Sequence, residues 1–265
     1  MPELEVHEIF DIECRTNEDY WALRMLEMYQ QLSWLIEGAT VRELSIFGNV
    51  WEDELFVNGV IDEIKLDGNK RLEIHELKTR TVKKMPAKAQ QTKDKLQAMI
   101  YRKLVHDLLF RKCGLQALKK HVPLNWNLVL NYNLQMYANE LLGPCSTLNE
   151  VFKIFDGFLR FVKFPELGSA VIEYCYQRDH SNIGFNKYQY DEMWLRSTIY
   201  HQLDYILGRR EPVGVDIEEA WKCGRCDYYD SCAWRKTEEK KLKERNTSNF
   251  THNCTYPMSS CSSSV

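Results

Sequence analysis

Two acidic residues and a lysine carry the spacing from which a catalytic site could be built. Asp62 lies in an otherwise apolar stretch, and Glu76 and Lys78 lie two residues apart in the next apolar stretch. Residues two apart on a strand point to the same face, so Glu76 and Lys78 would share one. Two converging carboxylates repel each other unless a cation lies between them, and such oxygen ligands favour Mg²⁺ or Mn²⁺. The metal would polarise a phosphoryl oxygen and activate water, while the lysine orients that water or neutralises charge developing on the phosphate.

A second signal follows in the predicted helix after these strands. Gln97 and Tyr101 are four residues apart, so they lie on one face of that helix. The three charged residues alone would also suit a surface hairpin with an ordinary ion pair. The added glutamine and tyrosine favour a functional site.

A third signal is a group of closely spaced cysteines, Cys223, Cys226 and Cys232. Thiolates at this spacing suit zinc or an iron–sulfur cluster. The chain has nine cysteines in all, an odd number, and no secretion signal at its N-terminus, so a disulfide framework is a poor interpretation. We interpret the isolated cysteines as small core residues.

The elements that would position these residues follow from periodicity and turn residues. Asp67, Gly68 and Asn69 predict a tight turn that places the strands of Asp62 and Glu76 side by side. Thr147 and Glu150 form a capping box. We predict helices over 17–37, 87–112, 148–162 and 188–207, and strands over 41–48, 55–66, 71–80, 126–137 and 169–177. This order predicts an α/β fold with one mixed sheet flanked by helices.

Composition limits the partners of this chain. It has 265 residues and a formal charge of −3, and 44% of its residues are hydrophobic. It has no apolar run long enough to span a membrane. Because the net charge is slightly negative, nucleic-acid contact requires a local basic segment, and such a segment follows the predicted site in the sequence. We expect DNA-binding side chains at Arg80, Lys83, Lys84, Lys88 and Lys93. Residues 236–265 are charged and then rich in Ser, Asn and Thr, which predicts a disordered tail.

These motifs resemble those of a known nuclease family. The stretches GVIDEI at 59–64, ELKTR at 76–80 and Gln97 with Tyr101 are similar to the RecB-type nuclease domain of the PD-(D/E)xK superfamily. With ELEVHEI at 3–9 and the cysteine-containing stretch 210–235, the chain resembles the exonuclease V (Dem1) family. The resemblance implies a restriction-endonuclease-like fold and one nuclease domain over 1–235. It also implies that Asp62, Glu76, the Leu77 carbonyl and Glu3 bind the metal, that Lys78 is catalytic, and that Gln97 and Tyr101 support the site.

The same resemblance bears on the cysteines. In that family the three cysteines hold a [4Fe–4S] cluster whose fourth cysteine lies upstream of the nuclease motifs. Here the chain starts two residues before Glu3, so we expect an N-terminally truncated version without that ligand. Cys14 is the nearest substitute, although it lies downstream of the expected position, and we do not favour it.

The function that follows is a metal-dependent exonuclease acting on single-stranded DNA in repair or genome maintenance. The alternatives are a catalytically impaired DNA-binding fragment or isoform, and a zinc or iron–sulfur interaction domain. We expect a monomer that works inside the cell, in the nucleus rather than the cytosol or mitochondrion, on single-stranded DNA. A single-strand-binding protein is a further expected partner, and no membrane contact is expected.

Overall fold

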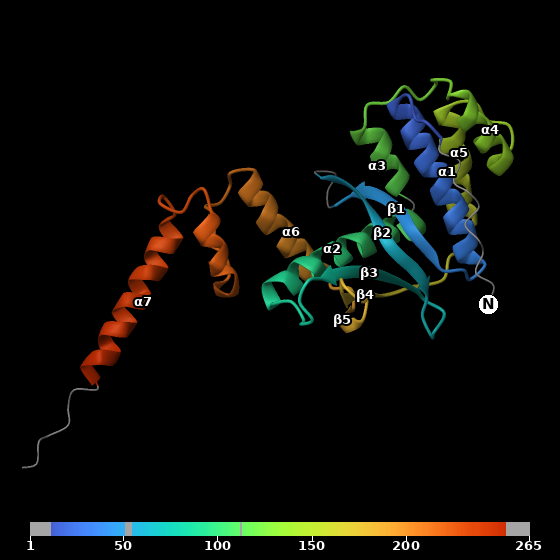
Figure 1. Ribbon diagram of the computed structural model, residues 1–265. Coiled ribbons are helices and arrows are strands. Elements are labelled where there is room, and N and C mark those ends of the chain that lie inside the picture. Colours follow the sequence, from blue (N-terminus) through green and yellow to red (C-terminus); the bar gives the residue numbers. More distant parts are fainter. Residues whose placement is uncertain (1–11, 51–54, 112, 253–265) are drawn as a thin grey trace, which may run out of the picture. The chain divides into compact units, whose positions relative to one another are not determined.

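The computed structural model describes residues 12–50, 55–111 and 113–252 (Figure 1). The chain forms two compact units. The larger comprises residues 1–86 and 90–200, and the smaller comprises residues 87–89 and 201–265. The division falls inside the range 1–235 that the sequence assigns to one domain, and that assignment stays a prediction.

A five-stranded mixed sheet organises the larger unit, with its strands in the order β1-β2-β3-β4-β5. The strands are β1 (Val41–Asn49), β2 (Phe56–Leu66), β3 (Leu72–Arg80), β4 (Leu167–Tyr176) and β5 (Asn182–Tyr188). Neighbouring strands are antiparallel except β3 and β4, which are parallel. The prediction of a mixed α/β sheet flanked by helices is therefore confirmed.

The turn between β2 and β3 forms where the sequence predicts it. The Asp67 carboxylate accepts the backbone N–H groups of Asn69 at 2.8 Å and Arg71 at 2.9 Å, as short polar turn residues do. Lys70 adopts a left-handed backbone with φ of 60°. The register that results pairs Glu63 with His75.

Helices pack on the sheet and on one another. They are α1 (Asn17–Ile36), α2 (Lys88–His106), α3 (Gly114–His121), α4 (Tyr132–Leu142), α5 (Leu148–Phe161) and α6 (Glu192–Ile206), and the π-helical turn Asp107–Arg111 continues α2. The capping box of Thr147 and Glu150 starts α5 as predicted. Helix α1 packs against α4, α5 and β1, and α3 packs against β1.

Helix α2 crosses one face of β3, β4 and β5. Tyr174 of β4 donates to the Asp94 carboxylate at 2.8 Å, and Asn186 of β5 donates to Gln91 at 2.9 Å. Both Tyr174 and Asp94 are buried. These contacts fix the face of α2 that carries Gln97 over the sheet.

The smaller unit contains the short helix Ile217–Arg225 and α7 (Ala233–His252). Residues 236–252 are thus helical, where composition predicts a disordered tail, and residues 253–265 lie outside the described residues. Pairs such as Arg235 with Glu239, at 3.1 Å, support this polar helix. Among the described residues, no helix is both long and apolar enough to cross a bilayer.

One predicted strand is wrong. Residues 126–137 contain a single isolated bridge at Val129, and α4 begins at Tyr132. The Asn131 side chain caps this helix by accepting the Leu134 N–H at 3.1 Å, and its backbone N–H donates to Asp19 of α1. The cap outweighs the weak strand pattern because asparagine is a strong helix N-cap. Helix α3 and strand β5 were not predicted.

Candidate active site

Two carboxylates lie close together just beyond Glu63 and His75, where the pairing of β2 with β3 ends. The Asp62 carboxylate accepts the Leu77 N–H at 2.7 Å, and the Glu76 carboxylate accepts the Asp62 N–H at 3.4 Å. The residues are far enough apart in sequence that the hairpin turn, not a local helix, brings them together. The predicted convergence of Asp62 and Glu76 is present in the structure.

Glu76 is the most perturbed acid of this group. Its side chain is 1% exposed, and burial raises the pKa of its carboxyl to about 7, with the nearby Asp62 charge acting in the same direction. Lys78 acts in the opposite direction. A metal cation, in addition to the Lys78 ammonium, would relieve the repulsion between the two carboxylates. The site therefore has the electrostatics of a divalent-metal site.

Lys78 and Gln97 complete a hydrogen-bonded set around Glu76. The Lys78 ammonium donates to Glu76 at 3.2 Å and to the Gln97 carbonyl at 2.8 Å. The Gln97 amide donates to Glu76 at 3.0 Å and to the Tyr101 hydroxyl at 3.3 Å. Strand β3 and helix α2 are therefore joined at the residues that the sequence singles out.

Arg24 of α1 is a residue near this site that sequence reasoning missed. Its guanidinium donates to the Gly59 carbonyl at 3.3 Å and to the Tyr20 hydroxyl at 2.6 Å. The residue is 8% exposed, and its Nε–H has no hydrogen-bond partner within the described structure. An arginine among the apolar residues of a predicted helix was the available signal, but nothing local showed what it would contact.

Gly59 is held from both sides. A Cβ at this position would lie 2.6 Å from the Tyr101 hydroxyl, which is closer than packed atoms allow, so α2 and β2 can approach this closely because the residue is glycine. Arg24 holds the carbonyl of the same residue. Because Gly59 is three residues before Asp62, these contacts fix the strand that carries the first carboxylate.

The donor set available for a metal is oxygen-rich. Asp62 and Glu76 lie together, and Leu77, whose N–H donates to Asp62 and whose carbonyl the resemblance makes a ligand, is 49% exposed. In the part of the chain that the structure describes, no group of three or more His, Cys, Asp or Glu side chains is placed to hold an ion. Mg²⁺ commonly binds through one or two carboxylates and keeps several waters, so the residues present suit it. Glu3 lies outside the described residues.

The predicted DNA-binding residues fall in two places. Arg80, Lys83 and Lys84 follow the site at the end of β3, and Lys93 is exposed on α2. Lys88 belongs to the first turn of α2, which is part of the smaller unit. The structure therefore groups three of the five beside β3.

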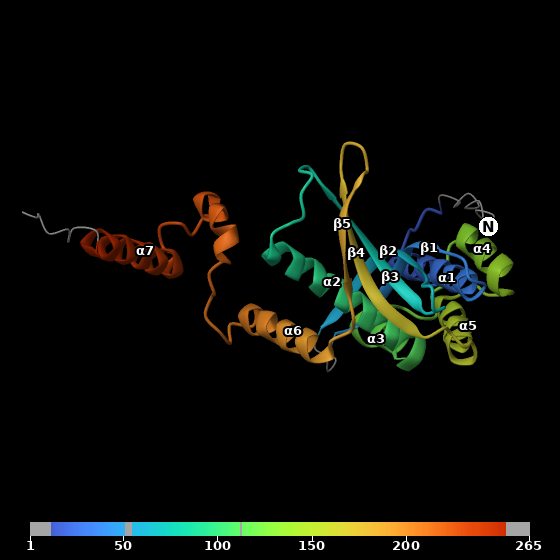
Figure 2. The ribbon, with the colours of Figure 1, turned by 90° about the horizontal axis from the view of Figure 1, so that it is seen from below.

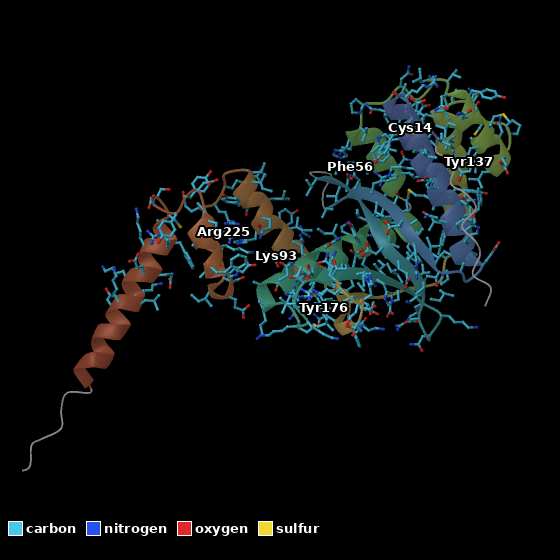
Figure 3. All side chains as sticks on the ribbon, in the orientation of Figure 1. Cys14, Phe56, Lys93, Tyr137, Tyr176 and Arg225 are labelled. Carbon is cyan, nitrogen blue, oxygen red and sulfur yellow. The ribbon has the colours of Figure 1, made fainter. Side chains whose placement is uncertain are left out.

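The three clustered cysteines lie in the smaller unit. Cys223 and Cys226 are joined by a backbone hydrogen bond of 3.1 Å, and the Arg235 N–H donates to the Cys232 sulfur at 3.5 Å. The described thiols are not gathered into a ready metal-binding group. Cys14 precedes α1 in the larger unit, and Figure 3 labels it there.

Comparison with known proteins agrees with the motifs. A family model described as "Exonuclease V - a 5' deoxyribonuclease" matches residues 1–74 and 146–235. Exonuclease V of Danio rerio is 32% identical over 234 residues, which is 88% of this chain and 59% of the relative. The chain belongs to the exonuclease V family.

Family membership confirms the resemblance found in the sequence. The ranges matched to the exonuclease V model contain Asp62 and the three clustered cysteines, whereas Glu76, Lys78, Gln97 and Tyr101 lie between those ranges. The geometry around Glu76 is thus an observation that does not depend on the match to the family model. The chain spans about three-fifths of the length of its Danio rerio relative.

Proposed function

We propose that this chain is a metal-dependent deoxyribonuclease that removes nucleotides from an end of single-stranded DNA. The observation that carries the proposal is the buried Glu76 beside Asp62 and Lys78, where burial and the like charge of Asp62 raise the pKa of Glu76 to about 7. The family model's description as a 5′ deoxyribonuclease supports action at the 5′ end. We further propose a restriction-endonuclease-like fold and a role in DNA repair in the nucleus.

The chain's own residues divide the work of phosphodiester hydrolysis. Asp62, oriented by the Leu77 N–H, and Glu76, oriented by Gln97, would hold Mg²⁺ or Mn²⁺. When bound, the ion supplies polarisation of a phosphoryl oxygen and activation of water. The Lys78 ammonium, held by Gln97, stabilises negative charge that develops on the phosphate.

For the smaller unit we propose that Cys223, Cys226 and Cys232 bind an iron–sulfur cluster. Support comes from their spacing and from the family model, which matches across residues 210–235. The N–H of Arg235 already donates to the Cys232 sulfur, as donors to cluster thiolates do.

The decisive experiment is cleavage of single-stranded oligonucleotides labelled at either end, in Mg²⁺, Mn²⁺ or Ca²⁺. We expect cleavage in Mg²⁺ or Mn²⁺, none in Ca²⁺, and loss by at least about 100-fold in Asp62→Ala with DNA binding retained. Glu63→Gln is the matched control, because its carboxylate lies next to Asp62 on β2 but pairs with Lys65 and Arg42. Equal turnover by Asp62→Ala and the parent chain would refute the assignment, as would cleavage unchanged in excess chelator.

A further inference from the structure

Two segments that are distant in sequence meet at one end of the sheet. Strand β3 ends at Arg80, where the loop to α2 follows, and the turn between β4 and β5 begins at Gln177. The Gln177 N–H donates to the Arg80 carbonyl at 2.8 Å, and Arg80 is paired with Tyr176 in the sheet. Figure 2 shows the loop and the β4–β5 turn side by side at this end.

The end formed by these segments is strongly basic. Four cations, Arg80, Lys83, Lys84 and Arg178, accompany one acid, Asp179, so the local charge is 4 − 1 = +3 in a chain whose total charge is −3. Lys83, Lys84 and Arg178 are exposed. We call these four cations the strand-end clamp. Arg178 joins the clamp through the fold, since it lies far from the basic segment that the sequence displays.

Internal contacts hold the clamp in shape. The Arg80 guanidinium donates to the Lys84 carbonyl at 3.0 Å, which closes the loop. The Lys83 ammonium lies 5.9 Å from the centre of the Tyr176 ring, which Figure 3 labels, and 3.9 Å from Asp179. In the turn, the Asp179 carboxylate accepts the Ser181 N–H at 2.9 Å. These contacts join the loop after β3 to the β4–β5 turn.

Strand β3 sets the distance between the clamp and the candidate active site. Strands β3 and β4 pair without interruption from Ile74 to Arg80, and Lys78 is two residues before Arg80. At about 3.3 Å per strand residue, Arg80 is about 7 Å along the strand from Lys78. A strand of nucleic acid with a phosphate at the carboxylates would therefore have neighbouring phosphates within reach of the clamp.

We propose that the strand-end clamp binds the phosphate backbone of single-stranded DNA next to the phosphodiester that is cleaved. The proposal rests on the proposed function for its substrate and adds the β4–β5 turn as a binding element. Cations that contact phosphates contribute affinity that is independent of sequence and falls with salt. The clamp thus acts on DNA binding, whereas Asp62, Glu76 and Lys78 act on the chemical step.

The test measures binding without cleavage. A fluorescein-labelled single-stranded oligonucleotide is titrated by anisotropy in EDTA, across about 50 to 200 mM NaCl. We expect Arg178→Gln to weaken binding on the order of threefold and to lower the salt slope by about 0.7, the value for one single-strand phosphate contact. Lys70→Gln is the matched control, because Lys70 is an exposed cation at the β2–β3 turn, before β3 begins. We expect its slope to equal the parent's.

A second variant separates charge from folding. Asp179→Asn removes the one acid of the turn but keeps an oxygen that can accept the Ser181 N–H. We expect it to bind the oligonucleotide more tightly than the parent, a gain that misfolding would not produce. A slope in Arg178→Gln equal to the parent's, or unchanged binding by Asp179→Asn, would overturn the clamp even if the parent cleaves DNA. A parent that shows these binding effects but never cleaves would instead refute the proposed nuclease function.

Discussion

Glu76 connects the electrostatics of the site to the metal binding that we propose for it. Its carboxyl is buried beside Asp62, and its pKa of about 7 means that it carries a proton over much of the acidic range. A metal ligand must be deprotonated, so binding an ion at Glu76 requires release of that proton. The same side chain therefore links metal affinity, pH and stability.

The first prediction concerns proton release. At pH 6 we expect Mn²⁺ binding to release close to one proton per chain, and the apparent affinity to rise with pH until about pH 7. Calorimetry in two buffers of different ionisation enthalpy measures the number of protons. Glu63→Gln should behave like the parent, because its carboxylate pairs with Lys65 and Arg42. Proton release that is absent at pH 6 would contradict the assignment of Glu76 as a ligand.

The second prediction concerns stability in the absence of metal. The pKa of Glu76 is higher in the folded chain than its usual 4.5, so the folded state holds the proton more tightly. Between about pH 4.5 and pH 7 this acid makes the fold less stable as pH rises. Glu76→Gln removes the buried charge, so we expect it to raise the free energy of unfolding at pH 8 by roughly 1 to 2 kcal/mol. Urea unfolding at pH 5 and pH 8 measures this, and equal effects at both values would contradict it.

The elements around the site differ in how far the sequence predicts them. The β2–β3 hairpin was predictable because its turn residues and alternating pattern are local, and all five predicted catalytic residues lie between positions 62 and 101. The strand predicted at 126–137 failed because Asn131 caps a helix instead. Strand β5 was missed because its sequence, NIGFNKY, is poor in β-branched residues.

Contacts between elements that are distant in sequence could not be predicted from local sequence patterns. Arg24 lies 35 residues from Gly59, and no periodicity indicates that α1 holds the carbonyl of that glycine. The pairing of Arg80 with Tyr176 likewise depends on the parallel register of β3 and β4. Such contacts require the full topology, because sequence spacing gives no information about them.

The third prediction tests Arg24 as a positioning residue for β2. Arg24→Met keeps the length and apolar packing of the side chain but removes the donor to Gly59. We expect kcat to fall about tenfold with KM for DNA nearly unchanged, since the displaced group serves the transition state. Arg24→Lys should recover part of the loss.

Arg102→Met provides the matched control for Arg24. Like Arg24, Arg102 donates to backbone carbonyls, those of Leu167 and Gly168, but it lies outside the site. If both variants lower kcat in proportion to a loss of thermal stability, Arg24 is a general structural residue. A separate loss in Arg24→Met identifies it as specific to the site.

At the scale of the whole molecule, the two units carry different chemistry. The carboxylates and their lysine lie in the larger unit, and the three clustered cysteines lie in the smaller one. The motifs for both were visible in the sequence, but the boundary near Tyr200 was not, because no linker-like composition marks it. Each unit can therefore be tested separately through the metal proposed for it.

The fourth prediction separates these two metals. After anaerobic preparation, we expect Cys223→Ser, Cys226→Ser and Cys232→Ser each to lower iron and sulfide content, because thiolates hold such clusters. Cys113→Ser is the control, since Cys113 is an exposed cysteine of the larger unit. Cys14→Ser should also leave the iron content unchanged. Equal iron in Cys226→Ser and the parent would refute the cluster assignment.

The parallel pairing of β3 with β4 also has a consequence for the order of folding. The β2–β3 hairpin closes over a few residues, whereas β4 can join β3 only after the chain from Arg80 to Leu167 has returned to the sheet. Distant pairings form slowly because the entropy of loop closure is lost before the contacts form. We expect pulsed hydrogen exchange during refolding to protect β2 before β4. Since Glu76 pairs with Ile172 of β4, the slow step that completes the sheet also fixes the backbone that carries the buried carboxyl.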